Sequence, residues 1–213
     1  PVRVHNDAVV MAAAEHWIGA AAGRPNALGM VVSTGVGGGL VLGDRLIDGG
    51  LGNAGHIGHI VVHPDGPACV CGGRGCLEPI ARGPATAAWA VEQGWTPSDP
   101  TKPADAKTLA DDAHAGDEVA IAAYNRSGEA VGIALASVAA LLDLDVAVIG
   151  GGLVQSGELL MDPLLAAFRY HAGLPHAARM SIVPASLGQD AGIIGAAALV
   201  QDGHRYWNAS DDG

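Results

Sequence analysis

The sequence predicts an α/β domain, in which strands and helices alternate along the chain. Two short apolar runs, residues 28–33 (LGMVVS) and 145–149 (DVAVI), are typical of buried strands in a parallel or mixed sheet. Each run passes directly into a glycine-rich turn, TGVGGG at residues 34–39 and GGG at residues 150–152. Helix-forming segments occur throughout the rest of the chain, and this combination favours a layered α/β architecture.

Composition indicates one globular domain with an aliphatic core. Of 213 residues, 49% are hydrophobic and only 15% are charged, which excludes a disordered chain. The net charge of −11 argues against a nucleic-acid partner for this segment, because nucleic-acid phosphates require lysine and arginine. No apolar run reaches the roughly 18 residues expected of a membrane span, and the opening PVRVHNDA does not have the pattern of a secretory signal peptide. We therefore expect no membrane partner.

The first predicted helix begins at an Asn-Asp pair. Asn6 and Asp7 precede an alanine-rich segment that we expect to be helical from residue 8 to about residue 22. Aspartate is a favoured N-cap, so the simplest interpretation of Asp7 is a helix cap. A carboxylate at a helix start in a cleft can also act as a general base.

The turn after the first strand has two interpretations. It leads into the expected hairpin strands 39–42 and 45–47, so it is either an ordinary glycine hairpin turn or a loop that binds phosphate. Glycine allows backbone N–H groups to approach a phosphate closely, and Thr34 adds a hydroxyl.

The remaining two thirds of the chain predict helices, short strands and one proline-rich loop. The expected helices are 77–81, 84–93, 106–113, 118–142, 157–172 and 190–201, and the further strands are 60–62, 145–149 and 181–184. Gly128 and Gly132 are spaced for close helix packing, and residues 94–103 (GWTPSDPTKP) form a loop excursion. We expect the domain to span residues 1–201, followed by a polar tail at 202–213.

All three cysteines of the chain lie close together, which predicts a metal site. Cys69, Cys71 and Cys76 follow His59 at ten, twelve and seventeen residues, with glycines between the second and third thiols. Three thiolates and one imidazole are the ligands that suit a tetrahedral, structural Zn²⁺. The alternative is three unligated cysteines and a solvated histidine. Because no cysteine remains for a disulfide, the set favours a reducing cytoplasm.

The segment that contains these cysteines resembles the zinc signature of the ROK family (repressors, open reading frames and sugar kinases). The resemblance rests on the pattern H-x9-C-x-C-G-x-x-G-C-L-E, preceded by G-x-I-G-H, at residues 55–78. Asn-Asp-Ala at residues 6–8 and the two glycine turns match in the same order. Kinases of this family begin with a smaller lobe that carries an Asp-x-Gly-x-Thr phosphate loop, for which this chain shows no counterpart. The chain therefore resembles the larger, C-terminal lobe.

The resemblance implies the ribonuclease-H-like, actin-like ATPase fold and a hexose kinase that uses ATP and Mg²⁺. Asp7 would take the proton from the attacking sugar hydroxyl. The implied sugar-binding residues are Asn6, His56, His59 and Glu78, and the implied phosphate-binding residues are Thr34, Gly35, Gly37, Gly151 and Gly152. Without the resemblance, Glu78 is explained as a carboxylate on the first turn of a helix.

His56 departs from the family pattern. The ROK family has glutamate at this position, where it accepts hydrogen bonds from sugar hydroxyls, and imidazole offers fewer acceptors than a carboxylate. We therefore expect altered hydroxyl recognition and weaker glucose binding, unless the substitution is simply tolerated.

Two other functions fit the same resemblance. ROK repressors retain this lobe and its zinc site and add an N-terminal helix-turn-helix, so the chain could be the sugar-sensing part of a transcriptional regulator. A sugar sensor that has lost catalysis is the third possibility. We favour the kinase because Asn6, Asp7 and both glycine turns are present. We also expect a homo-oligomer.

Overall fold

The computed structural model describes residues 4–207, and within them five strands form one mixed sheet in the order β3-β2-β1-β4-β5. The strands are β1 (Ala27–Val32), β2 (Val36–Leu42), β3 (Arg45–Ile47), β4 (Val146–Gly150) and β5 (Ser181–Pro184). β1 pairs antiparallel with β2 and parallel with β4. The antiparallel strands β1, β2 and β3 and the parallel strands β1, β4 and β5 therefore share β1. The expected α/β class is confirmed, with a sheet of the mixed kind.

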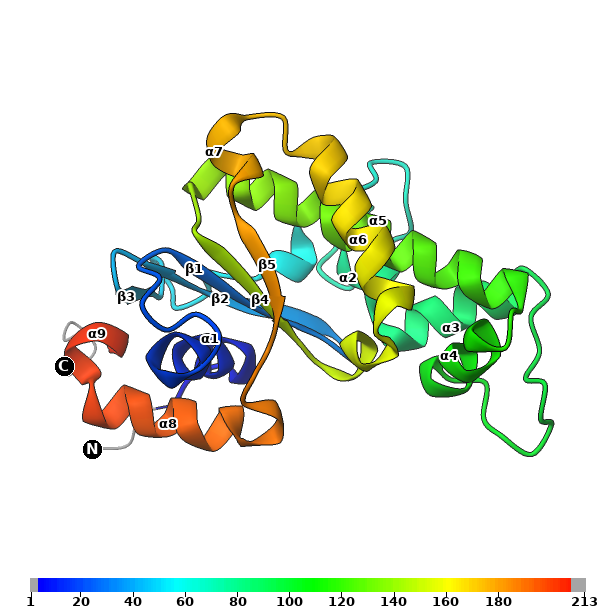
Figure 1. The fold of residues 1–213 in the computed structure, drawn as a ribbon, viewed down its shortest axis with the longest axis horizontal. Helices are drawn as coiled ribbons and strands as arrows, with labels where there is room; N and C mark the ends of the chain where they lie inside the picture. The colour runs from blue at the N-terminus through cyan, green and yellow to red at the C-terminus, as the bar shows by residue number, and fades with distance from the viewer. Residues whose placement is uncertain (1–3, 208–213) are drawn as a thin grey trace.

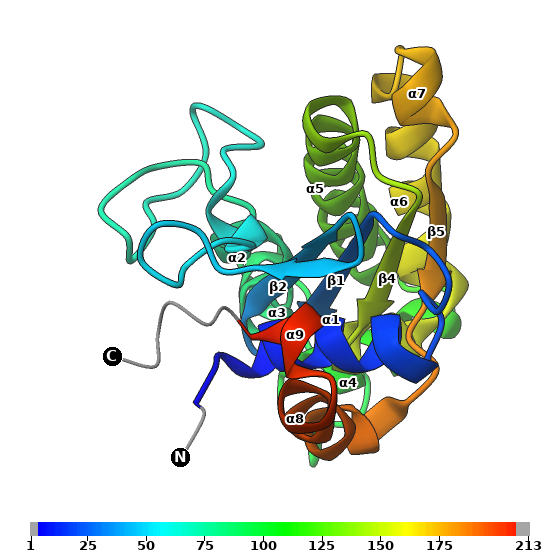
Figure 2. The same ribbon diagram turned by 90° about the vertical axis from the view of Figure 1, so that its left-hand side faces the viewer.

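Helices cover both faces of this sheet (Figures 1 and 2). The helices α1 (Asp7–Ile18) and α8 (Ala191–Gln201) pack on one face, and α5 (Glu118–Leu142) and α6 (Glu158–His171) pack on the other. Successive strand side chains point to opposite faces, so alternate residues enter different layers. Met30 and Ile149 lie in the layer of α5, whereas Val148 lies in the layer of α1. The apolar runs are therefore strands buried on both sides.

The long helix α5 packs very closely against α6. A Cβ atom added at Gly128 would lie 2.7 Å from the Leu160 carbonyl oxygen, and one at Gly132 would lie 2.4 Å from that of Leu164. No side chain fits in that space, which confirms the expectation that these two glycines serve close helix packing.

Shorter elements complete the domain. The remaining elements are α2 (Glu78–Ala81), α3 (Gly83–Glu92), α4 (Ala106–His114), α7 (Pro175–Ala178), α9 (Gly203–Tyr206), and the 3₁₀ turns Ile57–His59, Gly152–Ser156 and Gly188–Asp190. Of these, α3 and α4 lie beside α5, and α9 lies beside α8 (Figure 1). The loop at residues 94–103 is held against α4, because the buried Asp112 carboxylate accepts hydrogen bonds from the Trp95 indole and the Ser98 amide, both at 3.0 Å.

The cap interpretation of Asp7 is wrong, because Asn6 caps α1. The Asn6 Oδ1 atom accepts a hydrogen bond from the Ala8 amide at 3.0 Å, and Asp7 is the first residue of the helix. The helix also ends at Ile18, four residues earlier than we expected. It ends there because Gly19 leaves the helical conformation and the Glu15 carboxylate accepts the Ala20 N–H at 2.7 Å.

Two further expectations require correction. Residues 60–62 form no strand, and only an isolated bridge joins Val61 to Cys76, because the chain on either side bends to bring His59 and the cysteines together. Residues 202–207 do not form a polar tail, since α9 lies there and its Tyr206 is fully buried. Residues 1–3 and 208–213 lie outside the described residues. Within residues 4–207, no helix combines the length and the apolar character needed to cross a membrane.

Candidate active site

The glycine turn between β1 and β2 forms the floor of a cavity of about 470 Å³. The N-terminus of α1, the segment at residues 56–59 and the start of α2 form its walls. Its lining residues are Asn6, Asp7, Ala8, Val31, Ser33, Thr34, Gly35, Val36, Gly37, Gly38, His56, His59 and Glu78. The structure therefore brings together in one cavity all the residues that were predicted to bind sugar and the predicted phosphate-binding residues of the first glycine turn.

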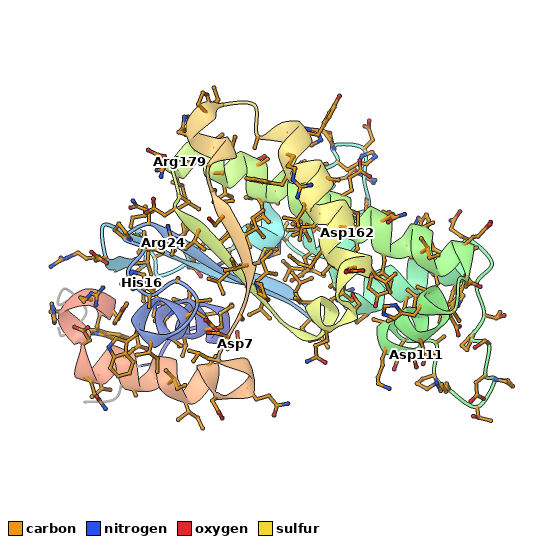
Figure 3. The ribbon with its side chains drawn as sticks, in the orientation of Figure 1. Asp7, His16, Arg24, Asp111, Asp162 and Arg179 are labelled. Atoms are coloured by element: carbon orange, nitrogen blue, oxygen red, sulfur yellow. The ribbon has the colours of Figure 1, made fainter. Side chains whose placement is uncertain are left out.

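The Asp7 carboxylate is placed to act on a molecule in this cavity. Its Oδ1 atom accepts the Ala8 N–H at 2.8 Å, and Oδ2 makes no hydrogen bond to the described part of the chain. Asp7 is exposed, and it lies at the opposite end of α1 from His16 (Figure 3). A carboxylate oxygen without a protein partner, facing a polar cavity, can accept a proton from a bound hydroxyl.

Glu78 and the two histidines form the opposite wall. The Glu78 Oε2 atom accepts a hydrogen bond from the Val36 amide at 3.1 Å, which ties α2 to the first residue of β2. The rings of His56 and His59 are nearly parallel, with centroids 6.2 Å apart and planes 20° apart. Glu78 thus does more than favour a helix start, because it connects the cysteine loop to the glycine turn.

A second, more apolar cavity of about 660 Å³ adjoins the first, and Ser33 and Thr34 line both. Its other lining residues are Gly83, Pro84, Ala88, Ala104, Asp105, Ala106, Lys107, Ala110, Asp111, His114, Tyr124, Gly152, Leu153, Gln155 and Ser156. Of the predicted residues in the second glycine turn, Gly152 lines this cavity and Gly151 lines neither. A Cβ atom at Gly151 would lie 2.3 Å from the Val32 carbonyl oxygen. Glycine is therefore required at this position because the backbone passes very close to β1.

Sequence reasoning missed the walls of the second cavity. They come from α3, α4 and the turn after β4, and small residues such as Ala88 and Ala110 carry no chemical signal in the sequence. Two hydrogen bonds shape the cavity: Tyr124 donates to the Ala106 carbonyl oxygen at 2.8 Å, and Ser156 donates to that of Leu153 at 2.7 Å. Burial raises the pKa of Tyr124 to about 12, so this hydroxyl stays a donor at neutral pH.

The four predicted metal ligands converge as a tetrahedral site requires. The ligand atoms of His59, Cys69, Cys71 and Cys76 all lie within 4.8 Å of one another. The Cys69 sulfur is 3.6 Å from His59 Nδ1, and the Cys71 sulfur is 3.7 Å from that of Cys76. In a tetrahedral site with metal–sulfur bonds of ~2.3 Å and metal–nitrogen bonds of ~2.0 Å, a sulfur and a nitrogen ligand lie about 3.5 Å apart and two sulfur ligands about 3.8 Å apart. The residues therefore fit a tetrahedral metal ion with no open position.

The electrostatics of the thiols also fit a bound cation. Burial, and secondarily the neighbouring cysteines, raise the pKa of the Cys76 thiol to about 12. A hydrogen bond from the Gly73 amide lowers the pKa of the Cys71 thiol. Several thiolates at these separations repel one another, and a cation at their centre removes that repulsion.

Comparisons with known proteins agree with this geometry. The ROK family model matches residues 1–203 of the chain. The glucokinase of Thermotoga maritima is 33% identical over 211 residues, which cover 94% of this chain and 66% of that enzyme. An N-acetylmannosamine kinase of Haemophilus influenzae is 38% identical over 204 residues, which cover 95% of this chain and 64% of that enzyme. The chain thus spans about two thirds of the length of the curated relatives it matches.

Solved structures of kinases and of a regulator share the fold. A ROK glucokinase from Streptomyces griseus, solved in complex with glucose and AMPPNP, matches with a TM-score of 0.84 at 34% identity, over 95% of this chain and 69% of that one. A ROK-family transcriptional regulator, a homologue of the E. coli MLC protein, matches with a TM-score of 0.82 at 29% identity, over 92% of this chain and 51% of that one. The mixed sheet and these neighbours fit the expected actin-like ATPase fold.

Proposed function

Because the chain belongs to the ROK family, we propose that it is the larger lobe of a kinase that transfers the γ-phosphate of ATP to a hexose hydroxyl. One observation carries this proposal. The polar cavity with Asp7 and the apolar cavity beyond it meet at Ser33 and Thr34, which line both. A sugar in the first cavity and a nucleotide base in the second would bring the reacting groups together at this turn. Glucose is the proposed substrate, since glucokinases are among the matched relatives.

In the proposed reaction Asp7 is the general base. Its Oδ2 atom takes the proton from the attacking sugar hydroxyl while that oxygen forms a bond to the γ-phosphorus. The bond between the γ-phosphorus and the β–γ bridging oxygen breaks, and the products are a sugar phosphate and ADP. Thr34 and the backbone N–H groups of the glycine turn stabilise the charge on the transferring phosphoryl group. Asn6, Glu78 and His56 contact the other sugar hydroxyls.

We assign Zn²⁺ to the cysteine cluster and a structural role to the ion. Four protein ligands leave no coordination position for a substrate, so the ion holds the loop that carries His56 and, through Cys76, the start of α2. ATP would arrive as its Mg²⁺ complex, with Mg²⁺ held mainly by the phosphate oxygens. The proposed kinase also contains a smaller lobe with the first phosphate loop, and closure of the two lobes would exclude water from the reaction.

Substitution of Asp7 by asparagine tests the proposal in the two-lobed protein. The amide keeps the shape of the side chain but cannot take the proton, so we expect kcat to fall by at least about a hundredfold. The melting temperature should change little, because Asn6 supplies the helix cap. Asp162→Asn, on the exposed surface of α6 and outside both cavities, is the matched control (Figure 3). Near-normal turnover by Asp7→Asn contradicts the assignment of the base. The 213-residue chain alone should not phosphorylate sugars.

A sugar-sensing domain of a transcriptional regulator is the second candidate. The regulator that shares this fold with a TM-score of 0.82 favours it, because the same cavity could bind sugar without catalysis. Sugar binding by calorimetry together with no detectable ATP-dependent phosphorylation by the two-lobed protein would support the regulator over the kinase. An N-terminal helix-turn-helix in the longer protein would support it further.

A further inference from the structure

The loop at residues 49–55, which leads into His56, is joined to the rest of the domain by very few polar contacts. In the described part of the chain, every hydrogen bond that residues 49–55 make stays within residues 48–57. The Ala54 amide donates to the Asp48 carbonyl oxygen at 2.9 Å and closes the loop at its base. Leu51, at the tip, is 90% exposed. The polar anchor of the loop is therefore Asp48, the residue that precedes it.

The Asp48 side chain bonds to His5, the residue just before Asn6 and Asp7. The Nε2 atom of His5 lies 2.9 Å from Asp48 Oδ1, and the two side chains are only 10% and 13% exposed. The other ring nitrogen, Nδ1, is 2.9 Å from the backbone nitrogen of Asn6. The Trp207 ring packs against the His5 ring, with ring planes 88° apart and centroids 6.4 Å apart.

These two contacts determine the tautomer of the His5 ring. A backbone N–H can only donate, so Nδ1 accepts from Asn6 and carries no proton. The proton is then on Nε2, which donates to the Asp48 carboxylate. A hydrogen bond to an ionised acceptor is roughly twice as strong as a bond between neutral groups, and low exposure protects it from competing water. The Asn6 amide, the His5 ring and the Asp48 carboxylate thus form one continuous chain of hydrogen bonds.

From this arrangement we infer that His5 and Asp48 form a brace that positions the loop at residues 49–55 and, with it, His56. The brace connects the Asn6–Asp7 wall of the first cavity to the loop that leads into His56, a residue of the opposite wall. Neither His5 nor Asp48 lines that cavity, so they are positioning residues and not catalytic ones. This inference rests on the proposed sugar-binding function of the cavity. An unbraced loop would have to be ordered when sugar binds, and that entropy cost would weaken sugar affinity.

Calorimetry of the two-lobed protein with glucose tests the brace. We expect His5→Ala and Asp48→Ala each to weaken glucose binding about tenfold, which is the effect of losing one charge-assisted hydrogen bond. The loss of affinity in the double variant should be smaller than the sum of the two single losses, because both substitutions remove the His5–Asp48 hydrogen bond. Asp48→Asn retains an acceptor oxygen for Nε2–H, so it should recover most of the affinity. The KM for glucose should rise more than kcat falls, and the KM for ATP should not change.

Amide hydrogen exchange provides a readout that does not depend on catalysis. Without sugar, residues 49–55 should exchange faster in His5→Ala and Asp48→Ala than in the parent protein, whereas β1 and β4 should not. His176→Ala is the matched control, since His176 is also half-buried and within residues 4–207 its side chain bonds to the Ala140 carbonyl oxygen alone. Unchanged exchange in the loop, or additive losses in the double variant, overturns the brace. If the parent protein binds no sugar, the proposed function fails, and the exchange experiment still decides whether the brace exists.

Discussion

A buried carboxylate on α1 leads to the most demanding prediction. Glu15 has no exposed surface and lies within 4 Å of no basic side chain in the described part of the chain. Its Oε1 atom accepts the Ser186 and Leu187 amides, both at 2.9 Å. Its Oε2 atom accepts the Ala20 amide at 2.7 Å and the Ser186 hydroxyl at 2.9 Å. This one carboxylate therefore joins the end of α1 to the segment between β5 and α8.

Glu15→Ala removes the acceptor of four hydrogen bonds. A buried donor left without a partner costs about 1–3 kcal/mol, and water can reach the exposed Ser186, so we take about 1 kcal/mol for each bond. The free energy of unfolding should then fall by about 4 kcal/mol, out of the ~5–15 kcal/mol of a typical domain. In a chain of this length that corresponds to a melting temperature about 8–16 °C lower. Glu15→Gln keeps the shape and about half of the acceptors, so its loss should be close to half as large.

Urea unfolding followed by circular dichroism measures this free energy. The m-value should not change, because the surface exposed on unfolding stays the same. Glu129→Ala, at an exposed position on α5, is the control and should stay within about 0.5 kcal/mol of the parent protein. A loss below about 1 kcal/mol for Glu15→Ala would show that water or a rearranged loop satisfies the four donors, and the structural reasoning would then be refuted.

Three other predictions concern the metal, the sugar and pH. Protein purified without added metal should contain about one zinc per chain, and Cys76→Ser should lose most of it; freely titratable thiols in the folded parent would contradict the site. His56→Glu should tighten glucose binding about tenfold or more in calorimetry, and equal affinity would show that His56 does not contact the sugar. Burial, and secondarily the Arg205 charge, lower the pKa of His16, whose ring bonds to the Tyr206 hydroxyl and faces Asp44 at 3.4 Å. The unfolded chain therefore binds a proton that the folded chain excludes, so the free energy of unfolding should fall as pH drops below about 6.5, and it should fall less in His16→Gln.

Much of the first cavity could be predicted because its residues lie in short, regular patterns. The turn at residues 34–39 follows a strand that is apolar throughout, and a strand of that kind has to be buried. The cysteine spacing requires the chain to fold back on itself, and the fold brings Glu78 against the glycine turn. Local chemistry and chain connectivity therefore determine this part of the site.

The contacts that were missed join residues far apart in the sequence. Glu15 bonds to Ser186, and His5 bonds to Asp48, across separations of 171 and 43 residues. From the sequence alone, Glu15 is an ordinary helix former in an alanine-rich segment, and nothing nearby indicates that its carboxylate is buried. The second cavity was missed for a different reason, since most of its walls are small apolar residues that any core would contain.

The helix α1 connects these findings, because it carries the proposed base at one end and the buried carboxylate at the other. The two residues are separated by about 12 Å along the helix, at a rise of 1.5 Å per residue. Between them, Ala12 lies so close to β1 that a Cβ atom at Gly29 would be 2.5 Å from its Cα atom. The middle of the helix cannot slide, so a displacement at Glu15 would tilt the axis about Ala12 and move Asp7 farther than Glu15, because Asp7 lies farther along the helix from Ala12. A displacement of about 1 Å at a reacting group can cost a hundredfold in rate. Stability and catalysis should therefore be linked through the orientation of this helix, even though Glu15 lines neither cavity.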